Sequence, residues 1–341
     1  MNDFSSLIDN FHKLSKSDKE EFVRIVTQHL IEKENDITDK KFEKGHYCLN
    51  CKSKNIIRKG FTPKGKQRYI CKDCGKTFSI TTNTVFYKSG KDASVWKKYV
   101  ECMIHHFSIR KSAIICKIHR NTAFVWRMKI LDTLQKMADG VILNGIVEAD
   151  ETFFKVSYMG NHSNSKRFIM PRKAHRCGGE VHKRGLSKEY ICVATAVNRG
   201  GLSFGKIATL GKPSLKAISK TLENRIEKGS VFCTDKFSVY KTIAKQMELN
   251  HIQIDNHKKK NGIYSIQRIN NYHSQLKDFI SHFKGVSSKY LNNYLIWHNF
   301  INWAKESFID KIQILFNWLI QTDMSIEYKD ISNRPNLPIV C

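Results

Sequence analysis

The sequence has no apolar run as long as a membrane span, and Met1 to Ser5 lack the basic and then apolar start of a signal peptide. It also lacks the basic amphipathic helix or the anchor that would hold a chain on a membrane surface. We therefore expect a cytoplasmic protein with no membrane partner. In that reducing compartment, regularly spaced cysteines indicate a metal site, because disulfides are rare there.

Acidic residues are scarce relative to basic ones: 31 Asp+Glu stand against 58 Lys+Arg, which gives a formal net charge of +27. Such an excess favours a polyanionic partner, because each neutralised phosphate releases counterions. With 341 residues, 41% of them hydrophobic, the chain is long and apolar enough to fold into two or more domains. The composition therefore indicates a globular protein that binds nucleic acid.

Four of the ten cysteines form two CxxC pairs. Cys48 and Cys51 make the first pair, Cys71 and Cys74 the second, and nineteen residues separate the pairs. This is the spacing of a zinc ribbon, and four cysteine ligands leave no open position, so the zinc is expected to be structural. A second zinc site is a weaker alternative, because the spacing of its candidate ligands matches no compact pattern. Those candidates are His175, Cys177, His182 and Cys192.

The segment between the two CxxC pairs is strongly basic and carries Pro63 and Gly65 at its centre. It is typical of a β-hairpin whose turn contains these two residues. The basic side chains on the hairpin would contact DNA phosphates. They are Arg58, Lys64, Lys66 and Arg68.

Residues 91–140 predict three helices, at Ser94–His106, Ile109–Cys116 and Ala123–Met137, the last capped by Asn121 or Thr122. The last two fit a helix-turn-helix whose second helix enters a major groove, although an ordinary helical hairpin gives the same pattern. Basic residues favour the DNA-binding interpretation; they are Arg110, Lys111, Lys117, Arg120, Arg127 and Lys129. We take Arg120, Arg127 and Lys129 as the expected DNA contacts.

From Gly140 the pattern changes to strands and helices. The predicted elements are strands at Ile146–Tyr158, Tyr190–Asn198, Leu202–Leu210, Ser230–Thr234 and His251–Asp255, helices at Leu215–Ile226 and Val239–Met247, and long helices from Ile266 onward. This order predicts an α/β fold of the ribonuclease H-like type, a mixed sheet flanked by helices. The segment 159–187 is basic and is expected to be a loop.

Three acids crowd the first of these strands. Glu148 and Asp150 should share one face of the strand, and Glu151 should point to the other. In a ribonuclease H-like fold, the metal ligands come from the first strand, the end of the fourth strand and a C-terminal helix. Asp150 and Asp235 occupy the first two places, and Asn270 lies on the polar stripe of the predicted helix that occupies the third.

These residue types suit a pair of magnesium ions about 4 Å apart, one activating a water or a 3′-hydroxyl and the other stabilising the leaving oxygen. Asp150 would bridge both ions, and Asp235 would hold one of them. Asn270, the third ligand, is neutral. Manganese could replace magnesium at such a site.

Several motifs occur together and in order between about Tyr47 and Trp303. They are GKQRYICKDCGKTFS, VEADETFF, KRGLSKE, the CTD triplet that ends at Asp235, and NNYHSQLKDFISHFKGVSSKYLNNYL. With the zinc ribbon and the helix-turn-helix, they resemble bacterial insertion-sequence transposases of the ISXO2-like group. The resemblance implies a DDE-type recombinase. In that group the third acid is Glu in many members and Asn in others, with a Lys seven residues later, and Asn270 and Lys277 match the Asn form.

The resemblance implies an enzyme that binds terminal inverted repeats, cuts at the transposon ends and joins the freed 3′-hydroxyls to target DNA. Lys277 would contact DNA phosphate near the scissile bond. Pairing two ends implies a homodimer or a higher oligomer, associated with the bacterial nucleoid through DNA. Two alternatives remain open, a transposase-derived DNA-binding protein without catalysis and a structure-selective nuclease on the same fold.

The predicted domain layout follows the motifs. It comprises an N-terminal helical segment (1–46), the zinc ribbon (47–90), the helix-turn-helix (91–140), the ribonuclease H-like catalytic domain (141–325) and a tail (326–341).

Overall fold

The structure is a computed structural model that describes residues 15, 17–19, 41–42, 45–63, 65–161, 168–171, 185–255, 260–303 and 308–337. The chain divides into two compact units, one of Met1–His106 with Ile312–Ser325 and the other of Phe107–Lys311 with Ile326–Cys341. Most of the predicted N-terminal helical segment, Lys64 and most of the basic loop lie outside the described residues. So do His175, Cys177 and His182.

The boundary between the units falls after His106, inside the segment that the sequence predicts as one helix-turn-helix domain. Helix α4 (Ala93–Ile104) consequently belongs to the first unit, and helices α5 (Ile109–Ile115) and α6 (Arg120–Asp139) belong to the second. The predicted domain boundaries themselves remain predictions.

The first unit contains a small antiparallel sheet in the order β1-β2-β3. Strand β1 is Ile56–Phe61, β2 is Gln67–Cys71 and β3 is Thr77–Ser79. Strands β1 and β2 form the predicted hairpin, in which the Gly65 N–H donates to the Thr62 carbonyl at 2.9 Å and Gly65 adopts a φ of 72°. Because this backbone conformation is strained for side chains with a Cβ, glycine suits the turn.

Helix α4 and part of α11 (Phe308–Gln321) supply the other packed surface of the first unit. The ring of Phe86 contacts Trp96 of α4 edge-on at a centroid distance of 5.1 Å and Phe316 of α11 at 5.9 Å. All three side chains are buried. An aromatic cluster therefore joins helices that are more than 200 residues apart in the sequence.

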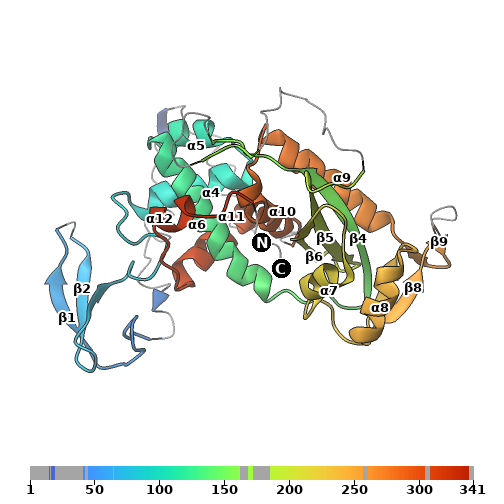
Figure 1. The fold of residues 1–341 in the computed structure, drawn as a ribbon. Helices are drawn as coiled ribbons and strands as arrows, with labels where there is room; N and C mark the ends of the chain where they lie inside the picture. The colour runs from blue at the N-terminus through green and yellow to red at the C-terminus, as the bar shows by residue number, and fades with distance from the viewer. Residues whose placement is uncertain are drawn as a thin grey trace. The chain divides into compact units, whose positions relative to one another are not determined.

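The second unit is built on a five-stranded sheet in the order β6-β5-β4-β7-β8 (Figure 1). The strands are β4 (Ile146–Lys155), β5 (Tyr190–Asn198), β6 (Ser203–Leu210), β7 (Val231–Thr234) and β8 (Asn250–Gln253). Strands β4, β5 and β6 pair antiparallel, whereas β4, β7 and β8 pair parallel. The five predicted strands are thus present, and together they make a mixed sheet.

Helices cover both faces of this sheet (Figure 1). Helices α7 (Leu215–Leu222) and α8 (Ser238–Gln246) pack with Val147 and Ala149 on one face. Helices α9 (Gln267–His282) and α10 (Leu291–Trp303) pack on the other face, against β5 and β6. On the second face, Gly205 of β6 lets Tyr272 of α9 approach, because a Cβ at this position would lie 2.9 Å from the tyrosine hydroxyl.

Short elements complete the second unit. They are β9 (Lys260–Asn261), β10 (Tyr264–Ser265), the 3₁₀ turn η1 (Ser288–Tyr290) and α12 (Tyr328–Ser332). Among the helices that the structure describes, none has both the length and the apolarity needed to cross a membrane.

Helices α5 and α6 pair as the sequence predicts, but the cap of α6 differs from the prediction. The Nδ1 atom of His119 accepts a hydrogen bond from the Asn121 N–H at 3.2 Å, so the cap is His119 and the prediction of Asn121 or Thr122 was wrong. In the turn between the helices, Lys117 adopts a φ of 50°, the left-handed conformation that glycine usually supplies. The absence of glycine from this turn therefore does not prevent the two helices from pairing.

Candidate functional site

The register between β4 and β7 brings Asp150 and Asp235 to adjacent positions. Glu148 of β4 pairs in parallel with Cys233 of β7, and each chain continues for two residues to its aspartate. The negative charge of Asp235 contributes to raising the pKa of Asp150, which shows that the two carboxylates are near one another. Two aspartates that come from separate parts of the sequence thus meet where β7 ends beside the central strand β4.

The Asp150 carboxyl is largely buried, with 25% of its side chain exposed. Burial raises its pKa, the Glu151 backbone N–H lowers it, Asp235 raises it and Lys277 lowers it, and the result is a pKa of about 6. The two carboxylates repel each other in a partly buried site. A divalent cation bound to both would offset this repulsion, so the site suits such an ion. The residues present therefore fit a magnesium or manganese site.

Glu148 fixes the beginning of α9. Its side chain is buried, and its Oε2 atom accepts hydrogen bonds from the backbone N–H groups of Arg268 at 2.8 Å and Ile269 at 3.1 Å. A carboxylate at this end of a helix satisfies donors that have no partner within the helix and complements the helix dipole. The sequence indicates only that Glu148 lies beside Asp150; the structure shows that it ties β4 to the helix that carries Asn270 and Lys277.

The polar stripe of α9 divides into exposed and buried members. Asn270, Ser274 and Lys277 are exposed, whereas His273 is buried. The charge of Lys277 lowers the pKa of Asp150, so the ammonium lies on the side of the Asp150 carboxyl. The structure therefore brings Asp150, Asp235 and Lys277 together. The role of Asn270 as a metal ligand remains a prediction.

His273 is the residue of this site that sequence reasoning missed. Its Nε2 atom lies 2.7 Å from the Thr195 hydroxyl, and its Nδ1 atom lies 3.9 Å from the Oδ2 atom of Asp150. Thr195 is the residue of β5 that pairs directly with Asp150. Only a strand register could have revealed this arrangement, because the helix pattern alone makes His273 one more polar residue on a solvated face.

Glu151 points to the opposite face of the sheet, as its position in the strand predicts. Burial raises its pKa to about 7; the nearby Tyr240 hydroxyl on α8 lowers this pKa, and the charges of Asp150 and Asp235 raise it. The Tyr240 hydroxyl and the Glu151 Oε1 atom are both buried, and neither has a hydrogen-bond partner. Glu151 is therefore a partly buried acid for which ionisation is unfavourable.

Replacing Glu151 with glutamine is expected to stabilise the protein above neutral pH only. The folded-state pKa of about 7 lies above the ordinary 4.5, so ionised Glu151 costs stability in full above pH 7 and costs nothing below about pH 4.5. Glu151→Gln should raise the thermal midpoint at about pH 8 and leave it unchanged at about pH 4.5. Differential scanning calorimetry at both pH values measures this, with the exposed Glu227→Gln as the control. A gain of equal size at the two pH values would contradict the account.

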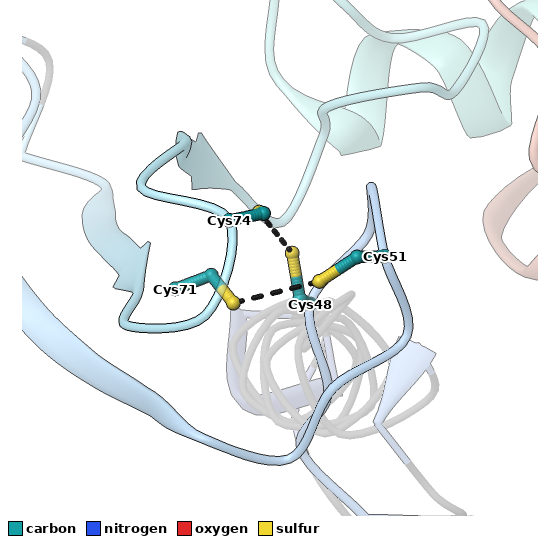
Figure 2. Close-up of side chains that lie close together, drawn as sticks. All are labelled: Cys48, Cys51, Cys71 and Cys74. Atoms are coloured by element: carbon teal, nitrogen blue, oxygen red, sulfur yellow. Dashed lines mark hydrogen bonds between the residues drawn. The ribbon is translucent and has the colours of Figure 1, made fainter.

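The four cysteines of the CxxC pairs converge on one point (Figure 2). The Sγ atoms of Cys48 and Cys74 lie 3.7 Å apart, those of Cys51 and Cys71 lie 3.5 Å apart, and all four lie within 4.8 Å of one another. Tetrahedral zinc with Zn–S bonds of about 2.3 Å needs sulfurs about 3.8 Å apart. The cluster therefore has the size of a four-cysteine zinc site.

The Cys48 thiol favours its charged form. Burial raises its pKa, but hydrogen bonds from the backbone N–H groups of Cys51 and Asn50 and contacts with the neighbouring thiols lower it, to about 7. Zinc binds the thiolate, so the environment of Cys48 favours the ligating form. The Ser53 backbone N–H lowers the pKa of Cys51, but burial and the neighbouring thiols raise it to about 12, so the support comes from Cys48 alone.

The residues predicted to contact DNA occupy different environments. Arg58 on β1 and Arg120 at the start of α6 are exposed, and Lys66 and Arg68 at the hairpin are partly exposed. Lys129 is partly buried; burial lowers the pKa of its ammonium, and the charges of Glu327 and Asp330 raise it. Lys64 lies outside the described residues.

Arg127 is buried, with 1% of its surface exposed. Its Nη2 atom donates to the Phe107 carbonyl at 2.7 Å, and its guanidinium lies 5.1 Å from the ring centroid of Trp297. A side chain held inside the fold in this way cannot reach a phosphate, so we do not retain the prediction that Arg127 contacts DNA. The guanidinium instead joins α6 to α10.

Truncating Arg127 is expected to destabilise the second unit without a direct effect on a DNA contact. Arg127→Ala removes a charged hydrogen bond and the packing against Trp297, so it should lower the free energy of unfolding by about 2 to 3 kcal/mol. Chemical denaturation followed by tryptophan fluorescence measures the loss. Arg120→Ala, at an exposed position on the same helix, should change stability by less than about 0.5 kcal/mol. Equal effects of the two substitutions would show that burial of Arg127 does not contribute to stability.

The fold and the two clusters define an α/β protein with a carboxylate centre on the central strands of a mixed sheet, and with a four-cysteine centre. Residues 142–300 match the ISXO2-like transposase domain family. A protein of unknown function in the transposable element ISH50 of Halobacterium salinarum is 24% identical over 258 residues, which cover 75% of this chain and 84% of that protein. The InsA protein of the insertion element iso-IS1N of Shigella dysenteriae is 30% identical over 76 residues, which cover 22% of this chain and 80% of that protein.

The chain belongs to the insertion-sequence transposases of the ISXO2-like group. Two solved structures resemble it only loosely. A simian T-cell lymphotropic virus intasome in complex with the PP2A regulatory subunit B56 gamma aligns with 59% of this chain and 67% of its own, at 12% identity and a TM-score of 0.28. A pre-cleavage Mos1 transpososome aligns with 67% of this chain and 78% of its own, at 8% identity and a TM-score of 0.24.

Proposed function

We propose that this transposase cuts DNA at the ends of its insertion sequence and joins the freed 3′-hydroxyls to target DNA, in a reaction that depends on magnesium or manganese. The observation that carries the proposal is the meeting of Asp150, in the middle of β4, with Asp235, which directly follows the neighbouring strand β7. The order of three antiparallel strands followed by two parallel ones, with α9 beside the pair, supports a ribonuclease H-like arrangement as part of the same proposal.

Asp150, Asp235 and Asn270 would hold the divalent cations, which activate the attacking oxygen and stabilise the leaving oxygen when bound. Lys277 would bind the phosphate next to the scissile bond, because its ammonium is exposed and lies near the carboxylates. Glu148 would keep α9, and therefore Asn270 and Lys277, in a fixed position relative to Asp150. Zinc at the four cysteines would hold the ribbon in its folded form.

DNA binding would rest on the basic hairpin and on the start of α6. Arg58, Lys66 and Arg68 lie on or beside a short hairpin, and Arg120 lies at an exposed helix start, so all four could contact phosphates. Lys64, from the sequence alone, would belong to the same hairpin surface, and partly buried Lys129 would contribute after a side-chain movement. The net charge of +27 would supply affinity for both the terminal repeats and the target.

The full-length protein would be incubated with Mg²⁺ and duplexes that carry either end of its own element, and the products would be mapped to the nucleotide. We expect nicks at the element boundary that leave 3′-hydroxyl ends, joining of those ends to a second duplex, and a paired-end complex that contains at least two copies of the chain. Scrambled duplexes should stay uncut.

Two other outcomes would replace the proposal. Equal cutting of end duplexes and scrambled duplexes would indicate a structure-selective nuclease. Specific binding of the ends without any cleavage in Mg²⁺ or Mn²⁺ would indicate a DNA-binding protein that has lost catalysis.

A further inference from the structure

A histidine and a threonine support the backbone of each of the two aspartates. The Thr195 hydroxyl donates to the Asp150 carbonyl oxygen at 2.7 Å and lies 2.7 Å from the Nε2 atom of His273. The Thr234 hydroxyl likewise donates to the Asp235 carbonyl oxygen at 2.9 Å and lies 2.9 Å from the Nε2 atom of His251. The His273 ring also faces a carboxylate of the site, because its Nδ1 atom lies 3.9 Å from the Oδ2 atom of Asp150.

The hydrogen bonds of Thr195 determine which nitrogen of His273 carries the proton. A hydroxyl group has one proton, and Thr195 gives it to the Asp150 carbonyl. The remaining contact of 2.7 Å therefore requires the Nε2–H of His273 to donate to the Thr195 oxygen. In the neutral ring this leaves Nδ1 unprotonated, with its lone pair available.

The position of Nδ1 agrees with a neutral ring. An imidazolium that donated to Asp150 would lie about 2.8 Å from the carboxylate. The observed separation between Nδ1 and the Asp150 Oδ2 atom is 3.9 Å, which is too long for that bond.

A separation of 3.9 Å suits two ligands of one metal ion. Ligand atoms about 2.1 Å from an octahedral ion lie about 3 Å apart when they are adjacent and about 4.2 Å apart when they are opposite. The 3.9 Å between Nδ1 and the Asp150 Oδ2 atom lies between these two values, so a side-chain movement of about 1 Å would bring the two atoms to adjacent ligand positions, and 10% of the His273 side chain remains exposed. The hydrogen bond to Thr195 is the kind of outer contact that orients a ligating histidine.

We propose that His273 is a ligand of the catalytic cation through its Nδ1 atom and that this nitrogen makes the site favour Mn²⁺ over Mg²⁺. The inference rests on the proposed function, because it concerns the same metal site. Mg²⁺ prefers oxygen ligands only, whereas an imidazole nitrogen increases affinity for first-row transition ions. His273 would then supply a protein ligand to a site whose third predicted ligand, Asn270, is a neutral residue.

The experiment uses the full-length, zinc-supplemented protein with Mn²⁺ as the probe. Electron spin-echo envelope modulation detects a nitrogen bound directly to Mn²⁺, and growth on ¹⁵N-histidine identifies that nitrogen as histidine without any substitution. We expect a directly bound histidine nitrogen in the wild type, its loss in His273→Gln and its retention in His251→Gln. His273→Gln should also raise the Kd for Mn²⁺ by at least about 10-fold and the Kd for Mg²⁺ by a smaller factor.

The possible results separate this inference from the proposed function. If Asp150→Asn abolishes Mn²⁺ binding but the wild type shows no histidine coupling, the inference is wrong and the metal site stands. A coupling that persists in His273→Gln also overturns it, and the isotope experiment keeps this conclusion independent of whether that variant folds. If Mn²⁺ does not bind the wild type, or binds Asp150→Asn equally well, both the inference and the proposed metal site fail.

Discussion

Asp150→Asn is expected to abolish cutting at the element ends, with a loss of at least about 10³-fold in the rate of strand cleavage. The substitution keeps the size of the side chain but removes the charge that would hold the cation beside Asp235. Because the Asp150 carboxyl is largely buried, an amide should fit the same space, and we expect the folded structure and the affinity for end duplexes to remain unchanged. Single-turnover cleavage of an end duplex in Mg²⁺ measures the effect.

Asp278→Asn is the matched control, because Asp278 is an exposed aspartate on α9. It should cut the end duplex at the wild-type rate. Cleavage by Asp150→Asn at a similar rate would remove Asp150 from the reaction and the carboxylate pair from the proposed function. Loss of end binding together with cleavage would instead show that the substitution disturbs the fold.

Removal of zinc is expected to unfold the ribbon. Structural zinc in comparable small sites contributes about 10 to 16 kcal/mol, far more than a three-stranded sheet of this size gains by its own packing. Cys74→Ser, or treatment of the wild type with a strong chelator, should eliminate the protected amide protons of β2 and β3 in hydrogen exchange. Affinity for end duplexes should fall with them, because Arg58, Lys66 and Arg68 lose their common scaffold.

Cys102→Ser serves as the control, because Cys102 is a buried cysteine of α4 outside the cluster. The wild type and this variant should each carry one zinc per chain by elemental analysis, and Cys74→Ser should carry none. Re-addition of Zn²⁺ should restore the chelated wild type. A ribbon that stays protected against exchange after the metal has gone would contradict a structural role for zinc.

Sequence periodicity predicted the sheet of the second unit and the faces of its first strand. Side chains alternate across a strand, so the placement of Glu148 with Asp150, and of Glu151 opposite, follows from local geometry. The hydrogen bonds of Glu148 to α9 and the position of Glu151 near Tyr240 of α8, on the other face, confirm this alternation. The local sequence of β4 could not predict which residues lie next to each acid, because α8 and α9 come from later parts of the chain.

The predictions made from the sequence differ from the structure mainly at polar side chains that the fold buries. Arg127 lies on a helix rich in basic residues, and its pattern indicated an exposed, DNA-facing side chain. Its burial depends on Trp297, which is 170 residues away in the sequence. His273 shows the same limitation, because its inward orientation depends on Thr195, a residue of another element.

The sequence by itself predicted the four-cysteine cluster, the order of the strands along the chain and the two aspartates as candidate metal ligands, because turn spacing and strand alternation are local properties of the chain. Only the tertiary structure decided that Arg127 is structural, that Glu148 fixes α9 and that the free nitrogen of His273 faces Asp150. The physical reason is that hydrogen bonds and desolvation of single polar groups depend on which distant surfaces pack together, and sequence periodicity carries no information about that choice.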